Sequence, residues 1–134
     1  MVAHIVVVAD SDWRLPPDTA ADLLRDRWPG SHVRVADPAT AEEWPTRNVV
    51  GEMRTDVGPL EICVDRDGST VYIEGHYQAT SDAVAWYRSV VPASENILLT
   101  NEDGSYVWSV RADVTADDVR AFMKSGDPVH LEPR

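Results

Sequence analysis

The residues whose types and spacing suggest chemistry begin with two carboxylates. Asp10 and Asp12 follow an apolar run, Val2–Ala9, that is rich in β-branched residues and predicts a buried, central strand. Carboxylates bind Mg²⁺, and the ends of strands commonly carry ligand sites. A small enzyme or ligand-binding domain that uses Asp10 and Asp12 with a metal ion or a phosphate ligand is therefore one hypothesis for this chain.

The spacing Asp10-x-Asp12 resembles the first motif of haloacid-dehalogenase-type phosphotransferases. The resemblance implies that Asp10 attacks phosphorus, that Asp12 handles protons and that Mg²⁺ neutralises the phosphate. That family also requires a lysine before its late acidic motif, for which Asp117-Asp118 would stand, but the single lysine, Lys124, comes after both. The positive end of a helix dipole explains Asp117-Asp118 equally well. We predict no catalytic residue and no metal ligand.

A second group, Cys63, Glu74 and His76, has the residue types of a nucleophile, a base and an orienting group. Cysteine catalysis needs a thiolate that a nearby histidine or positive charge stabilises, whereas acidic neighbours raise the pKa of a thiol. We therefore interpret Cys63 as a small outward or half-covered side chain. The histidines lack the paired spacing of metal ligands, and His4 is interpreted as a hydrogen-bonded histidine of the core or of a sheet edge. We predict no cofactor.

The elements that must position these residues are organised around the stretch Leu60–Glu74, which predicts a β-hairpin. Aliphatic residues recur there at every second position, as in a half-buried strand, and Asp65–Gly68 predicts a four-residue turn. This turn pairs Ile62 with Val71 and Val64 with Ser69. The opposite face then carries Glu61, Cys63, Thr70, Tyr72 and Glu74.

A second stretch, Asn96–Val110, repeats the Asp-Gly-Ser turn signal of the first. Two copies are too few for a repeat architecture, so we interpret the likeness as shared turn chemistry. A turn at Asn101–Gly104 puts apolar residues on both faces of this hairpin. That pattern predicts a central strand pair that is covered, at least partly, on each side.

Three further patterns predict helices. The first helix opens at Pro16-Pro17-Asp18 and lies between the strand Val2–Ala9 and a strand at His32–Ala36, which suggests a βαβ unit. Thr80 or Ser81 is expected to cap the second helix, and Thr115 the third, which ends before Gly126.

Together these patterns predict an α+β fold in a single domain over residues 1–126, with residues 127–134 as a loosely held C-terminal tail. The expected architecture is a mostly antiparallel sheet of six or seven strands with an N-terminal βαβ unit. About three helices are expected to pack mainly on one face.

The composition favours a protein partner over other partners. The formal net charge is −11 and the sequence pI is about 4.6, so the surface repels nucleic acid and anionic membranes and attracts a basic protein. One cysteine allows no internal disulfide and suits the cytoplasm, where we expect the chain to act. No apolar run approaches the length of a membrane span.

The segment Thr80–Met123, with AWYRSVVP, ILLTNEDGSYVWSV and a short capped helix, resembles the immunity proteins of bacterial polymorphic-toxin systems. The resemblance implies a cytoplasmic protein, not an enzyme, that binds a basic toxin domain and occludes its active site. As contact residues we predict Glu42, Glu43, Trp44, Glu61, Tyr72, Glu74, Glu102 and Asp103. A homo-oligomeric module paired through a sheet edge stays open as a further alternative.

Overall fold

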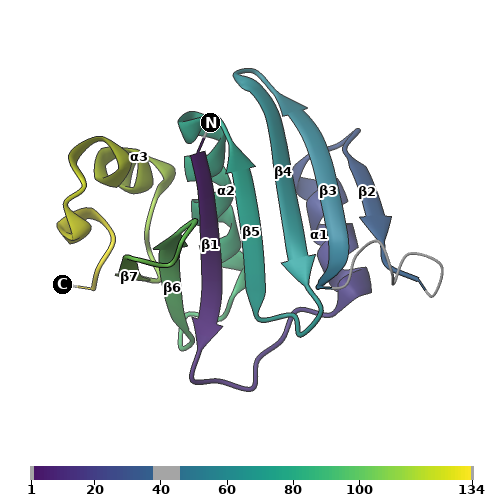
Figure 1. Ribbon diagram of the computed structural model, residues 1–134, viewed down its shortest axis with the longest axis horizontal. Helices are drawn as coiled ribbons and strands as arrows, with labels where there is room; N and C mark the ends of the chain where they lie inside the picture. The colour runs from purple at the N-terminus through teal and green to yellow at the C-terminus, as the bar shows by residue number, and fades with distance from the viewer. Residues whose placement is uncertain (1, 38–45, 134) are drawn as a thin grey trace.

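A computed structural model describes residues 2–37 and 46–133 of the chain, which form one seven-stranded sheet with three α-helices (Figure 1). The strands are β1 (Val2–Ala9), β2 (His32–Val35), β3 (Arg47–Thr55), β4 (Gly58–Asp65), β5 (Thr70–Gly75), β6 (Asn96–Asn101) and β7 (Val107–Val110). The helices are α1 (Pro17–Arg27), α2 (Tyr77–Val90) and α3 (Ala116–Ser125), followed by a short 3₁₀-helix, η1 (Pro128–His130). None of these helices is long and apolar enough to cross a membrane.

The sheet has the strand order β2-β3-β4-β5-β1-β6-β7, and every neighbouring pair is antiparallel. β1 and β2 therefore run in the same direction, with α1 between them in the chain and three other strands between them in the sheet. The predicted α+β class, the antiparallel sheet and the strand–helix–strand start of the chain are confirmed. The predicted hairpin Leu60–Glu74 is formed by β4 and β5, which lie in the interior of the sheet.

The hydrophobic core fills the space between one face of the sheet and the helices. Figure 1 shows α1 and α2 behind the sheet, and their Leu24 and Tyr87 are fully buried in the core cluster. Because successive strand residues point to opposite faces, Val6 and Val8 are buried beneath the helices while Ile5 is half-buried on the other face. No helix of the described residues covers that other face, which we call the helix-free face (Figure 1).

The register of the β4–β5 hairpin differs from the predicted one by two residues. Ile62 pairs with Ile73 rather than with Val71, and Val64 pairs with Val71 rather than with Ser69. Ser69 and Gly68 instead bond outside the hairpin: the N–H of Val8 donates to the Ser69 carbonyl at 2.9 Å, and that of Leu15 to the Gly68 carbonyl at 3.0 Å. A two-residue shift leaves every side chain on its predicted face.

The second hairpin, β6–β7, lies at the edge of the sheet, so the prediction of a central strand pair is wrong. Ile97 and Leu99 are buried on the helix side, whereas Val107 on the helix-free face is 54% exposed. Apolar residues on both faces therefore mark an uncovered apolar surface here, not a second core.

The chain also differs from expectation at two element ends. α2 begins at Tyr77 with His76 as its N-cap, so the predicted caps Thr80 and Ser81 lie inside the helix and are buried. The last residues are not loosely held, because Leu131 is fully buried and its carbonyl accepts the Arg111 N–H at 2.8 Å. The predicted start and end of α3 are confirmed by a capping box at Thr115 and a left-handed residue after the helix.

Candidate protein-binding surface

The structure places the predicted contact residues in two groups. Glu61, Tyr72 and Glu74 lie on the helix-free face, where Glu61 is directly opposite Glu74. Glu102 and Asp103 lie in the exposed turn that joins β6 to β7. The predicted residues Glu42, Glu43 and Trp44 lie outside the described residues.

A row of glutamates crosses the helix-free face. Glu52 of β3 is directly opposite Glu61 of β4, which is directly opposite Glu74 of β5, and the row continues to Ala3 of β1. Side chains directly opposite on antiparallel strands have Cβ atoms about 4.5–5.5 Å apart, and like charges at that separation destabilise the sheet. We call Glu52, Glu61 and Glu74 the glutamate row.

Positive charge offsets the glutamate row only in part. Arg34 bonds Glu52 at 3.2 Å, and Arg47 approaches Glu61 at 3.9 Å, with all four side chains at least 39% exposed. Ion pairs this exposed contribute little. Glu74 has no ion-pair partner among the described residues. The negative charge at the β5 end of the row is therefore available to a cation from outside.

The surface beside the glutamate row is hollowed on both sides. One hollow of about 350 Å³ is lined by all three glutamates of the row. Another of about 200 Å³ is lined by Glu61, Tyr72, Glu74 and Glu102. Four of the predicted contact residues thus meet at one concave site, although they come from three separate stretches of the chain.

An apolar strip continues the helix-free face from these hollows to the edge of the sheet. Ile5 is directly opposite both Tyr72 and Thr100, and Thr100 is opposite the exposed Val107. Sequence reasoning missed this strip and also missed Glu52. The signal for the strip was the continuous apolar run of β1, which fits a strand that is apolar on its uncovered face as well as in the core.

Cys63 lies within this face but has no catalytic surroundings. Its side chain is 1% exposed, so the expectation of an outward or half-covered thiol is wrong. Its Sγ donates to Glu61 Oε1 at 3.3 Å. Burial first, and then the negative charge of Glu61, raise the pKa of Cys63 to about 12. The thiol is therefore protonated at neutral pH and is a poor nucleophile.

His76 does not join Cys63 and Glu74 in a catalytic group. Its Nδ1 accepts the Gln78 N–H at 3.2 Å as the cap of α2. The chain leaves the strand before this residue, so the proposed nucleophile, base and orienting group are not assembled. The ring of His76 instead packs on that of Tyr77, with their centroids 4.7 Å apart.

Asp10 and Asp12 are exposed in the loop after β1. That loop is ordered by other groups: Ser11 Oγ accepts the Trp13 N–H at 3.0 Å, and Arg14 donates to the Ser11 carbonyl at 2.8 Å. Nowhere in residues 2–37 and 46–133 do three or more His, Cys, Asp or Glu side chains gather closely enough to hold a metal ion. A function that uses Asp10 and Asp12 stays a prediction.

Comparisons of the chain with protein-family models, with curated proteins and with solved structures found no match.

Proposed function

We propose that this chain is a non-catalytic binding protein that holds a basic partner against its helix-free face. The glutamate row carries the proposal. Directly opposite like charges cost stability, and replacing one glutamate by a neutral residue would remove that cost. A lysine or arginine side chain placed over the row would relieve the repulsion and make charge-assisted hydrogen bonds.

The proposed partner is the basic enzymatic domain of a toxin, and the proposed class is the immunity proteins of bacterial polymorphic-toxin systems. A net charge of −11 speeds the encounter with a basic domain, and the apolar strip from Ile5 to Val107 adds area that water leaves on binding. In this role the chain acts in the cytoplasm, where it binds the toxin domain and occludes its active site.

The experiment that tests this function begins with the tagged chain captured from its own cells, together with the products of neighbouring genes, at low and high salt. The captured partner is then produced on its own and its enzymatic activity is measured with and without the chain. We expect one basic enzyme whose activity is lost at equimolar chain, with affinity that falls as salt rises.

Matched variants locate the contact. Glu61→Gln with Glu74→Gln removes two charges from the glutamate row, and we expect at least about tenfold weaker binding. Asp12→Asn with Asp113→Asn removes the same charge from exposed positions elsewhere and is expected to change binding by less than about threefold. Equal effects of the two pairs, or a partner without enzymatic activity, would contradict the proposal.

A further inference from the structure

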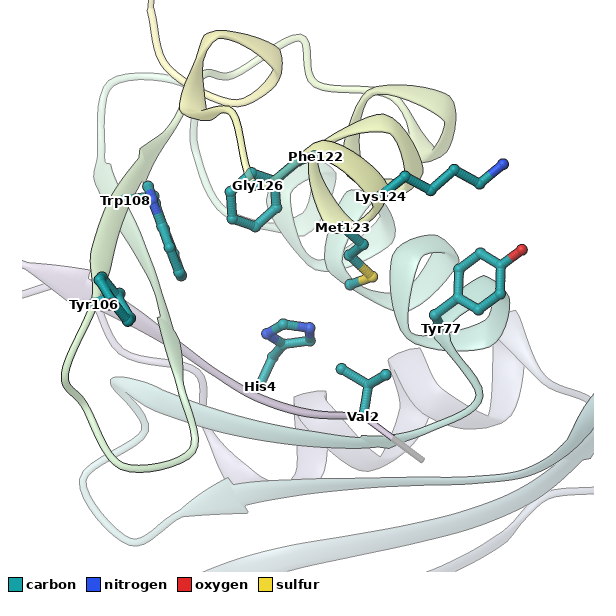
Figure 2. A pocket seen from close by; sticks show the side chains of 9 residues that line it. All are labelled: Val2, His4, Tyr77, Tyr106, Trp108, Phe122, Met123, Lys124 and Gly126. Atoms are coloured by element: carbon teal, nitrogen blue, oxygen red, sulfur yellow. The ribbon is translucent and has the colours of Figure 1, made fainter.

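A pocket of about 870 Å³ lies on the opposite side of the sheet from the glutamate row, below α3 (Figure 2). Val2 and His4 of β1 form its floor. Tyr106 and Trp108 form one wall, and Phe122 and Met123 of α3 form its roof. The volume is within the range of small-molecule sites, and the lining is mostly apolar.

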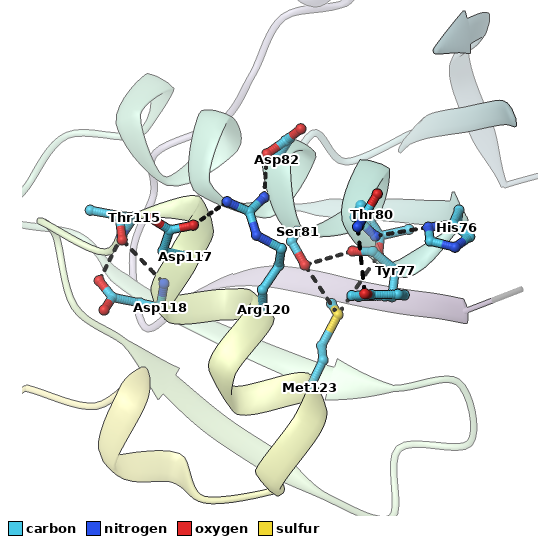
Figure 3. Close-up of polar contacts among 11 residues, drawn as sticks. His76, Tyr77, Thr80, Ser81, Asp82, Thr115, Asp117, Asp118, Arg120 and Met123 are labelled. Carbon is cyan, nitrogen blue, oxygen red and sulfur yellow. Dashed lines mark hydrogen bonds and ion pairs between the residues drawn. The ribbon is translucent and has the colours of Figure 1, made fainter. Parts of the chain in front are cut away.

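The pocket exists because α3 is held by α2. Figure 3 shows Arg120 of α3 bonded to Asp82 of α2 at 3.0 Å, and Ser81 Oγ lies 3.3 Å from the sulfur of Met123. The Thr115 capping box fixes the other end of the helix. These contacts fix the position of the roof relative to the floor of the pocket.

His4 supplies an unsatisfied polar group on the floor of the pocket. Its side chain is 8% exposed, both ring nitrogens are covered by neighbouring atoms, and neither makes a well-aligned hydrogen bond within the described part of the chain. Burial lowers the pKa of His4, opposed in part by the backbone of Thr100. The neutral ring offers one donor and one acceptor, and an unpaired buried group of this kind destabilises the free protein.

The two ends of the pocket differ in chemistry. At one end, Tyr106 is 63% exposed and stacks on Trp108, with ring centroids 5.7 Å apart and planes at 15°. Trp108 meets Phe122 edge-on at 4.7 Å. Figure 2 shows Tyr77 and Lys124 at the other side. Lys124 is the single lysine of this acidic chain, and it makes no ion pair among the described residues.

We propose that this pocket binds a small planar aromatic carboxylate. The ring system lies against Trp108 and Phe122 and the carboxylate faces Lys124. A polar substituent on the ring hydrogen-bonds His4, whose ring nitrogens are covered in the structure and become accessible when the imidazole turns toward the pocket. Stacked aromatic rings with an exposed flat surface favour a planar ligand. The lysine selects a negative charge where the rest of the surface repels one. This site is independent of the proposed protein-binding face.

The test uses three related probes and isothermal titration calorimetry. 6-Hydroxy-2-naphthoate carries the ring, the charge and a polar substituent; 2-naphthoate lacks the substituent, and 6-hydroxy-2-naphthamide lacks the charge. We expect the first to bind the whole chain at one site and more tightly than the other two. Amide cross-peaks in β1, β7 and α3 should shift in ¹H–¹⁵N spectra, while those of the glutamate row should not.

Variants assign the roles of the pocket residues. Lys124→Met should weaken naphthoate binding about fivefold and leave binding of the naphthamide unchanged, since an ion pair with an exposed lysine contributes modestly. His4→Phe should remove the advantage of the hydroxylated probe over 2-naphthoate. Arg25→Met, which removes an exposed cation on α1, is the control and should leave the binding of all three probes unchanged.

Three outcomes would overturn the proposal. In the first, none of the three probes shows saturable binding at any concentration up to its solubility limit. Another is binding that Lys124→Met and His4→Phe leave unchanged, which would show adsorption without recognition. The third is a concentration-dependent dimer in sedimentation that Tyr106→Ser abolishes, because the pocket would then accept a second copy of the chain. Failure of the protein-binding proposal would affect none of these results.

Discussion

Tyr87 is a buried tyrosine whose hydroxyl has no partner. The side chain is fully buried in α2, and no described residue bonds its oxygen. An unpaired buried hydroxyl costs free energy that a phenylalanine of the same shape would avoid. We predict that Tyr87→Phe raises the free energy of unfolding in urea by about 1 kcal/mol. Tyr106→Phe, at an exposed position, should have no effect, and a loss of stability in Tyr87→Phe would show that the hydroxyl is bonded in solution.

Asp118 is the residue through which acid should loosen α3. It accepts the Thr115 N–H at 2.9 Å and pairs with Arg111, and these contacts lower its pKa from the ordinary value of 3.8. The unfolded chain therefore binds this proton more readily, so the stabilisation is complete above pH 3.8 and is lost as the pH falls through the lower folded pKa.

The change that tests this is Asp118→Asn, measured by urea unfolding across a pH series. The difference in unfolding free energy between wild type and variant should be constant near neutral pH and should shrink below pH 3.8. Asp113 carries the other carboxylate near Arg111, and its side chain is 86% exposed. Asp113→Asn should therefore give a small difference in unfolding free energy with little dependence on pH. A difference for Asp118→Asn that stays constant into acid would contradict the assignment.

At the scale of elements, the sequence predicted which face of the sheet a side chain occupies better than it predicted which residues pair across neighbouring strands. The alternation in β4 and β5 placed Glu61, Cys63 and Glu74 on one face, and this held although the register moved by two residues. A period of two cannot distinguish registers that differ by two, because both put the same side chains on the same face. The deciding contacts, from Val8 and Leu15 to the turn, come from a segment more than fifty residues away in the chain.

The same limit applies to the candidate surface. The glutamate row forms only when β3, β4 and β5 pair in the observed registers. The pocket forms only when α3 packs against α2. The sequence contains Glu61 and Glu74 in one hairpin, so these were found. Glu52 was missed because its place opposite Glu61 depends on a second pairing. The surroundings of the His4 ring nitrogens depend on the side chains packed around them, which the pattern of a single strand does not contain.

The two Asp-Gly-Ser turns offer an internal comparison at this scale. Gly68 and Gly104 have nearly the same positive φ, 74° and 72°. A Cβ at Gly68 would lie 2.8 Å from the Leu15 carbonyl oxygen, whereas one at Gly104 would meet nothing within 4 Å. We predict that Gly104→Ala costs about 1 kcal/mol from backbone strain alone and that Gly68→Ala costs at least about 2 kcal/mol. Thermal unfolding would measure the loss of stability in both variants. Equal losses would show that the loop before α1 shifts at little cost to admit the Cβ at position 68.

For the whole molecule, the glutamate row couples stability to binding. Because Glu74 is opposite Glu61 and has no ion-pair partner among residues 2–37 and 46–133, we predict that Glu74→Gln raises the unfolding free energy by about 0.5 kcal/mol at low salt. The gain should fade as salt screens the repulsion. Glu132→Gln, which removes an exposed charge outside the sheet, is the control. A variant less stable than wild type would mean that Glu74 has a stabilising partner in solution.

The length of the two edge strands affects how readily the sheet can add a strand from another chain at high protein concentration. β2 and β7 close the two edges of the sheet with four residues each, while β1, β3 and β4 inside it have eight or nine. A short border strand presents few free backbone groups for another chain to extend. The long strands that would template such growth are enclosed on both sides. An acidic chain with this arrangement is expected to stay dispersed at high concentration, and to meet other molecules through its side chains rather than through its backbone.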